Sequence, residues 1–171
     1  TNHLGHFQLT ARLWPALAAD GGARVVSVSS RGHHFSPFRF DDPNFDEGYD
    51  KWQAYGQAKT ANMLFAVALD RRLAAKGVRV FSNHPGGIAT ELGRYMSQAD
   101  IEWLATRIRS GPGGDTFKFK TVPQGAATQV WAATSPEPQP TSRSRPRGGR
   151  WGATARRRPP RPESQRLTRR R

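Results

Sequence analysis

Apolar residues at helical spacing mark the start of the chain. Between residues 7 and 19 they recur mostly three or four positions apart, and Asp20-Gly21-Gly22 then interrupts them. This spacing predicts one amphipathic helix that stops before the glycines. Pro15 lies inside the stretch and has no backbone N–H, so we expect a kink there. The apolar positions are Phe7, Leu9, Leu13, Leu17 and Ala18.

A β-branched run and a long polar stretch come next. Residues 23–30 read Ala-Arg-Val-Val-Ser-Val-Ser-Ser, with glycines before them and polar residues after them, which predicts a buried strand. Residues 31–51 are rich in Pro, Asp, Gly, His and Phe without any period, so we expect a surface loop. Loops of that length often carry functional residues.

An alanine-rich segment predicts the longest helix, from about Lys51 to Ala75, which Gly77 closes. Residues 78–83 predict a second strand, and Pro85-Gly86-Gly87 breaks the chain directly after it. A strand, a helix and a strand in this order imply a right-handed parallel crossover. One face of the helix carries Ala54, Ala58, Ala61, Phe65 and Ala68.

The C-terminal part of the chain divides at Ser135. Before it, the pattern predicts two shorter helices, over residues 100–109 and 122–134. After it, Pro, Arg, Ser, Gly and Thr dominate and aliphatic residues almost vanish, so we expect residues 136–171 to be disordered. The density of Arg and Pro also resembles what a frame-shifted, GC-rich reading frame would encode. Residues 1–135 then form one α/β domain.

The positive charge of the chain is concentrated in this tail. The formal net charge is +14, of which residues 136–171 contribute +10, with 12 Arg and 2 Glu. Such a density of arginine could bind nucleic acid without sequence preference, which gives an alternative function: an inactive fragment with a nucleic-acid-binding tail. Trp151 is the only aromatic residue of the tail, and no nucleic-acid-binding fold is recognisable, so this alternative is not favoured.

The absence of cysteine excludes disulfides, thiolate metal sites and a cysteine nucleophile. No apolar run approaches the roughly 20 residues of a membrane helix, and no charged segment followed by an apolar one opens the chain. We therefore expect a cytoplasmic protein without a membrane span. The chain begins with Thr1 and reaches a helical pattern at once, which indicates a start inside a larger coding sequence.

Tyr55 and Lys59 carry the first sign of chemistry, because a helix places such residues about 5–6 Å apart on one face. A tyrosine that exchanges protons near neutral pH needs a pKa below the usual value of about 10, and a neighbouring ammonium favours the phenolate. At roughly 4 Å and an effective dielectric near 20, the attraction is about 4 kcal/mol. The pair alone is a weak signal, since many amphipathic helices have this spacing.

Two further features lie at the same predicted edge of the sheet. Ser29-Ser30 ends the first strand, and Pro85-Gly86 follows the second. Open parallel sheets bind ligands outside the carboxyl ends of their strands. The sequence therefore predicts a functional site at this edge, with Tyr55 and Lys59 beside it.

The motifs in residues 1–135 resemble those of the short-chain dehydrogenases/reductases, in the same order and spacing. They are Asn2-His-Leu-Gly-His-Phe7, Val26-Ser-Val-Ser-Ser30, Tyr55-Gly-Gln-Ala-Lys59 and His84-Pro-Gly-Gly-Ile-Ala-Thr90. The long loop before Tyr55 is most similar to the retinol-dehydrogenase-like and WW-domain-oxidoreductase-like branches. The resemblance implies the C-terminal half of a Rossmann-like, doubly wound parallel sheet. It also implies an NAD(P)-dependent oxidoreductase that interconverts an alcohol and a carbonyl by hydride transfer.

The resemblance also implies roles for single residues. Tyr55 would be the general acid/base, and Lys59 would support it and bind the nicotinamide ribose. Ser30, rather than Ser29, would orient and polarise the substrate oxygen. Asn2 matches the asparagine that supports a proton relay through ordered water.

The cofactor implied is NAD or NADP, without a choice between them. The family's glycine-rich turn is not present, because neither Pro85-Gly-Gly87 nor Gly111-Pro-Gly-Gly114 has the G-x-G-x-x-G form. We therefore expect this chain alone to bind the cofactor poorly. The residues that match the family's segment at the nicotinamide end are Pro85, Gly86, Ile88 and Thr90, in addition to Tyr55 and Lys59.

The expected partners are a small alcohol or carbonyl substrate and, by analogy with the family, a second copy bound through the first helix and the Tyr55 helix. No metal site is expected. His33 and His34 are adjacent, so we expect their side chains to point in different directions, and Asp41, Asp42 and Asp46 lie on the loop.

Overall fold

The computed structural model describes residues 1–111, 114 and 117–136. The expected disordered tail lies outside the described residues except for Pro136, and so does part of the Gly111–Gly114 segment. The elements are α1 (Leu4–Arg12), α2 (Trp14–Ala18), β1 (Ala23–Val28), η1 (Arg31–Phe35), α3 (Lys51–Leu73), η2 (Ala74–Lys76), β2 (Val78–Asn83), η3 (Glu91–Gly93), α4 (Gln98–Arg109) and α5 (Val122–Thr134), where η is a 3₁₀-helix.

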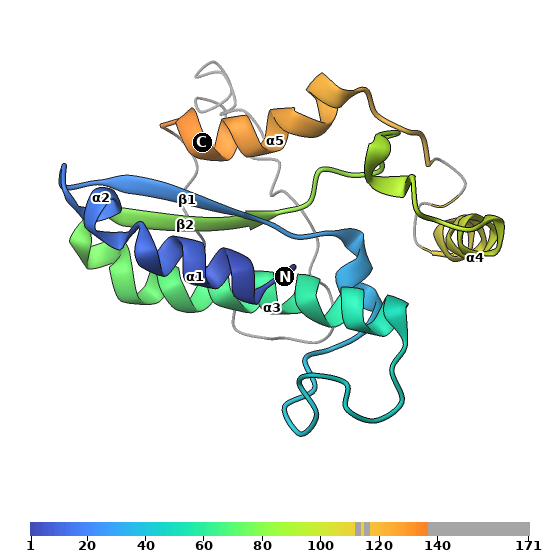
Figure 1. Cartoon of the computed structure of the whole chain (residues 1–171). Coiled ribbons are helices and arrows are strands. Elements are labelled where there is room, and N and C mark those ends of the chain that lie inside the picture. Colours follow the sequence, from blue (N-terminus) through green and yellow to red (C-terminus); the bar gives the residue numbers. More distant parts are fainter. Residues whose placement is uncertain (112–113, 115–116, 137–171) are drawn as a thin grey trace, which may run out of the picture.

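The described strands form a parallel pair joined by α3, as the order of elements predicts. Ala23 lies opposite Val78 and Val28 opposite Asn83, so both strands end at the same edge. Helices α1 and α3 cover one face of the pair and α5 covers the other (Figure 1). This layered α/β arrangement confirms the predicted fold class. It also puts the segments that follow Val28 and Asn83 side by side.

The N-terminal helix is broken rather than kinked. Helix α1 ends at Arg12 and α2 begins at Trp14, so the single helix expected with a kink at Pro15 is two helices. Pro15 occupies the first turn of α2, where a missing N–H leaves no hydrogen bond unmade. The break lies at Leu13, two residues before the proline.

Strand β1 is shorter and less buried than expected. It ends at Val28, and only Ser27 within it is buried. Among the described strands, β1 pairs along one edge only. The expected surface loop after it is partly helical, because residues 31–35 form η1 against α3. A 3₁₀-helix of five residues is too short to be predicted from hydrophobic periodicity.

Helix α3 buries a different face from the alanine-rich one. Of that set only Ala61 is buried, whereas the polar residues Gln57, Asn62 and Asp70 are buried as well. Asp70 accepts hydrogen bonds from the Arg79 side chain and from the backbone N–H of Val80, both at 3.0 Å. The core beside it is apolar: Ala66, Val78 and Val80 are buried, with Trp14, Ala23, Val25, Leu69 and Leu73 packed around them.

Candidate active site

Tyr55 and Lys59 lie half-buried on one face of α3. The Lys59 ammonium nitrogen is 5.7 Å from the centre of the Tyr55 ring. It also donates a hydrogen bond to the Val28 carbonyl, with Nζ and O 3.3 Å apart. Burial lowers the pKa of Lys59 below its usual value. The helix thus holds a cation next to the tyrosine at the end of β1.

The two serines after β1 have different environments. The Ser29 hydroxyl donates to the Lys59 carbonyl at 2.8 Å and is buried. The Ser30 oxygen accepts from the Gly32 backbone N–H at 3.0 Å, as the N-cap of η1. A hydroxyl that accepts one bond still has its own proton to donate. Ser30 therefore suits a ligand oxygen, whereas Ser29 serves the scaffold.

Close packing of η1 on α3 fixes the Tyr55 ring. A Cβ atom added to Gly32 would lie 2.5 Å from Cε1 of Tyr55, well inside contact distance. One added to Gly56 would lie 2.8 Å from the Gly32 carbonyl oxygen. Both positions therefore need glycine for the approach rather than for a turn. Neither was singled out from the sequence.

Asn2 is brought to the site through its backbone. Its carbonyl accepts from Nδ2 of Asn62 at 3.1 Å, and the same nitrogen donates to the Val28 carbonyl at 3.3 Å. Asn62 is completely buried. The sequence motifs gave Asn62 no role, although a buried asparagine three residues after Lys59 is a polar residue that needs partners.

The Pro85–Thr90 segment is held from a distant part of the chain. The Lys120 ammonium donates to the Pro85 carbonyl at 3.2 Å, and the Lys120 backbone N–H donates to the Gly87 carbonyl at 2.9 Å. Gly86 has φ +94°, a conformation that favours glycine. A Cβ atom there would lie 3.1 Å from Cε of Lys120, so this side chain covers Gly86.

The far end of this segment is held as well. Ile88 packs so closely on Gly125 that a Cβ atom at residue 125 would lie 2.1 Å from Cδ1 of Ile88. Thr90 is the N-cap of η3. The structure therefore places Pro85, Gly86 and Ile88 beside the end of β2, while Thr90 lies further on and is exposed.

Histidines gather near the same edge. The His33 and His34 ring centres are 3.8 Å apart, so the expectation that the side chains diverge is wrong. Burial, and after it the positive charges of Arg31, His33, Lys120 and His34, lower the pKa of His84. The part of the chain that the structure describes holds no group of three or more His, Cys, Asp or Glu side chains able to bind a metal.

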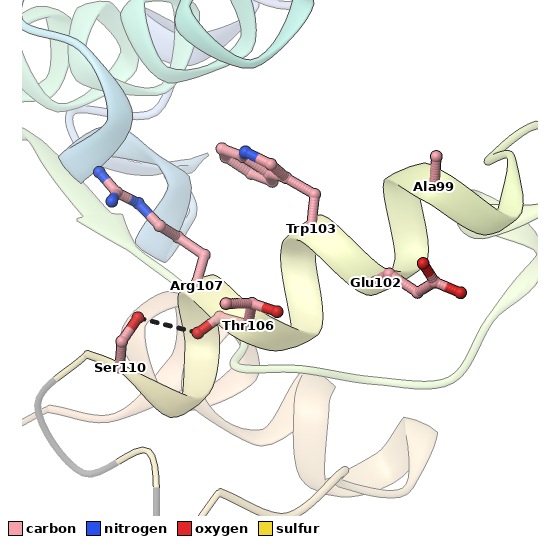
Figure 2. A pocket seen from close by; sticks show the side chains of 6 residues that line it. All are labelled: Ala99, Glu102, Trp103, Thr106, Arg107 and Ser110. Atoms are coloured by element: carbon pink, nitrogen blue, oxygen red, sulfur yellow. Dashed lines mark hydrogen bonds between the residues drawn. The ribbon is translucent and has the colours of Figure 1, made fainter.

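A surface pocket of about 420 Å³ follows α4 and contains none of the predicted site residues. Figure 2 shows its lining, with Trp103 directed toward η1 and α3. Trp103 stacks on Trp52 with ring centres 4.6 Å apart and meets Phe35 edge-on at 5.3 Å. Trp52 lies one turn before Tyr55, so this aromatic cluster joins α4 to the site. The pocket is lined by Ala99, Glu102, Trp103, Thr106, Arg107 and Ser110.

Comparison with known proteins agrees with the motifs. The sequence model of the family described as short chain dehydrogenase matches residues 1–100. The chain belongs to the short-chain dehydrogenase family. This confirms the resemblance found in the sequence motifs.

Relatives of this chain include a "Probable oxidoreductase" of Streptomyces lividans, 43% identical over 137 residues. Human retinol dehydrogenase 14 is 38% identical over 136 residues. Both matches cover 80% of this chain but only 46% and 39% of the relatives. The chain therefore spans less than half the length of these relatives.

A solved structure supports the fold of this chain. A candidate short-chain alcohol dehydrogenase from Sinorhizobium meliloti 1021 superposes with a TM-score of 0.52 at 21% identity. The match covers 78% of this chain and 47% of that one. None of the described helices is both long and apolar enough to cross a bilayer.

Proposed function

We propose that this chain supplies the catalytic half of an NAD(P)-dependent oxidoreductase that interconverts an alcohol and a carbonyl. The observation that carries the proposal is the pairing of Tyr55 with Lys59, whose ammonium lies 5.7 Å from the tyrosine ring, with Ser30 two residues after the end of β1. A phenol, an ammonium and a hydroxyl at one sheet edge can bind an alcohol oxygen and move its proton.

In the oxidation direction, the Ser30 hydroxyl donates a hydrogen bond to the substrate oxygen and holds the alcohol against Tyr55. The Tyr55 oxygen takes the alcohol proton as the carbon–oxygen double bond forms. NAD(P)⁺, when bound beside these residues, would supply the acceptor for the hydride of the alcohol carbon. The Lys59 ammonium stabilises negative charge on the Tyr55 oxygen. In the reduction direction Tyr55 returns the proton to the carbonyl oxygen.

The residues present fit the nicotinamide end of the cofactor. Lys59 uses one N–H on the Val28 carbonyl, and an ammonium has three, so donors remain for ribose hydroxyls. The glycine conformation at Gly86 suits close approach of a ligand to the backbone, once the Lys120 side chain moves aside. Pro85, Ile88 and Thr90 would complete this side. The choice between NAD and NADP belongs to residues outside this set.

We also propose that two copies of the chain pair through α1 and α3. Apolar side chains on both helices are exposed, which is unfavourable unless something covers them. Leu4 and Phe7 on α1 are 69% and 51% exposed, and Leu64 and Val67 on α3 are 47% and 39% exposed. Mass measurement in solution, with Phe7→Ser as the interface variant, tests this part of the proposal.

A chimera tests the activity. In the chimera, this chain replaces the region that it matches in the Streptomyces lividans relative. The rest of the chimera is the sequence of that relative. We expect alcohol-dependent reduction of NAD⁺ or NADP⁺ across a panel of alcohols that includes retinol, which the name of the human relative suggests. Tyr55→Phe should lower the rate roughly 10²–10⁴-fold. Tyr49→Phe, at a residue that is 71% exposed, is the matched control and should not. A folded, cofactor-binding chimera that oxidises no alcohol would overturn the proposal.

A further inference from the structure

Asn62 makes three hydrogen bonds from a completely buried position. Its Nδ2 donates to the Asn2 and Val28 carbonyls at 3.1 and 3.3 Å, and its Oδ1 lies 3.0 Å from Nδ1 of His3. The partners come from the start of α1 and the end of β1, so one amide on α3 joins three elements. The two carbonyls also fix the amide orientation, because only the nitrogen can donate to them.

The Val28 carbonyl links Asn62 to the candidate active site. It accepts from Asn62 and, at 3.3 Å, from the Lys59 ammonium. A carbonyl oxygen has two lone pairs and can accept both bonds. The peptide plane that Asn62 holds is therefore the one on which Lys59 rests. Lys59 and Asn62 are also neighbours on α3, three residues apart.

We propose that Asn62 is a positioning residue that fixes the Val28 and Asn2 carbonyls, and through them the place of the Lys59 ammonium beside Tyr55. The inference rests on the proposed function only in giving Lys59 a chemical role. Asn62 touches no reacting atom. Its effect passes through the shared carbonyl of Val28 on the Lys59 side and through the backbone of Asn2 on the other.

A buried asparagine could instead only stabilise the fold, without positioning Lys59. A comparison with Gln57 distinguishes a positioning role from a purely structural one. Gln57 is also an amide on α3 and is 5% exposed. It accepts from the Arg39 backbone N–H at 2.9 Å and donates to the Pro43 carbonyl at 2.7 Å, both in the loop before α3. Gln57→Ala removes a comparable pair of buried bonds without touching Lys59 or Asn2, which makes it the matched control.

The test reads Lys59 directly, in the complete chain and without cofactor. The acylation rate of the Lys59 side chain is followed against pH by peptide mass spectrometry. Lys59 makes no ion pair among the described residues. Its ammonium faces the ring of Tyr55, which is ionisable. A second ionisable group, His3, lies on the other side of Asn62, to which it is hydrogen-bonded. Burial alone holds its pKa down, so a change in local solvation should appear as a change in the midpoint.

In Asn62→Ala, water enters beside the Val28 carbonyl and the midpoint should rise by roughly half a pH unit or more. Asn62→Ser, which keeps one short donor, should restore part of the shift. Gln57→Ala should leave the midpoint unchanged. An unchanged midpoint in folded Asn62→Ala, or an equal shift in Gln57→Ala, would overturn the proposal. The proposal would also be overturned if both Asn62 variants failed to fold while Gln57→Ala folded, because Asn62 would then have a purely structural role.

A second arm uses the chimera. Asn62→Ala should lower kcat about tenfold, leave KM for the alcohol within about twofold, and move the acidic limb of the pH–rate profile. Gln57→Ala should move neither kcat nor that limb. The two arms fail separately. An inactive chimera with a shifted Lys59 midpoint counts against the dehydrogenase function, whereas an active chimera with an unmoved midpoint counts against Asn62.

Discussion

The Ser29 hydroxyl donates a hydrogen bond to the backbone carbonyl of Lys59, with the two oxygens 2.8 Å apart. This bond joins the end of β1 to the middle of α3, at the residue that carries the site's cation. The bond therefore fixes the position of the C-terminal end of β1 relative to α3. Ser30 follows by one residue and faces a different environment, so two adjacent hydroxyls have separate tasks.

Exchanging each serine for alanine should separate these tasks. Ser29→Ala should lower the free energy of unfolding by about 1 kcal/mol, because the hydrogen bond from the buried Ser29 hydroxyl to the Lys59 carbonyl is lost. Ser30→Ala should lower kcat/KM of the chimera roughly 100-fold, because the substrate oxygen loses a donor. Urea unfolding and alcohol oxidation, measured on both variants, provide the comparison. The assignment of Ser30 is wrong if Ser29→Ala has the larger effect on kcat/KM at equal folded fraction.

Gly32 offers a test of the Tyr55 position. In Gly32→Ala the new Cβ would lie 2.5 Å from Cε1 of Tyr55, so the ring or η1 must shift. We expect a loss of about 1–3 kcal/mol in the free energy of unfolding, as for overpacked cores, together with a loss of chimera activity. Gly5 in α1 is the matched control, since a Cβ there meets nothing within 4 Å.

Gly5→Ala should therefore stabilise the chain by about 0.5–1 kcal/mol through helix propensity and leave activity unchanged. Thermal unfolding and alcohol oxidation distinguish the two glycines. Equal behaviour of Gly32→Ala and Gly5→Ala would mean that η1 does not hold the Tyr55 ring.

The sequence predicted β2 and α5 with the bounds that the structure shows, because local signals mark both. Gly77, with φ +78°, ends the preceding turn, and Pro123 opens α5. The buried face of α3 was not predictable in the same way. Asn62 and Gln57 are buried because their partners lie far along the chain, and hydrophobic periodicity counts such polar residues as exposed.

The sequence motifs also missed contacts at the candidate site, because the partners lie far apart in the sequence. The Lys120 side chain reaches the carbonyl of Pro85, which is 35 residues earlier, and no local pattern relates the two. Short motifs placed Tyr55 and Lys59 on one helix face because a helix has a fixed period. The motifs did not predict the hydrogen bond from the Lys59 ammonium to the Val28 carbonyl. Every residue except proline has the same backbone donor and acceptor, so a pattern of side chains cannot identify a particular carbonyl as an acceptor.

Stability should fall with acid through His84. His84 is exposed, yet partial desolvation first and positive neighbours such as Arg31 second lower its pKa from 6.5. The unfolded chain therefore takes up a proton more readily than the folded one below 6.5. The stability is present above that pH and is lost as pH falls through the lower folded-state pKa. His84→Gln should flatten this loss in urea midpoints measured across the window.

The control for this pH effect is His6→Gln, at an exposed residue of α1. It should keep the acid loss of the parent chain. His34 has a pKa lowered by burial and then by His33 and Arg31, so some acid loss should remain in His84→Gln. If His84→Gln and the parent chain lose stability in parallel, His84 does not carry the effect.

The isolated chain should bind NADH and NADPH weakly, in contrast to the chimera. Dinucleotide pyrophosphates bind at glycine-rich turns that open a helix, and this sequence contains no G-x-G-x-x-G segment. The Lys120 side chain also covers Gly86, so a nicotinamide must displace it before it reaches the backbone. Fluorescence titration of both proteins measures the difference, with Lys59→Met to remove the proposed donor to the ribose. Micromolar binding by the isolated chain, lost in Lys59→Met, would contradict this prediction and place the main cofactor affinity at the Lys59 end.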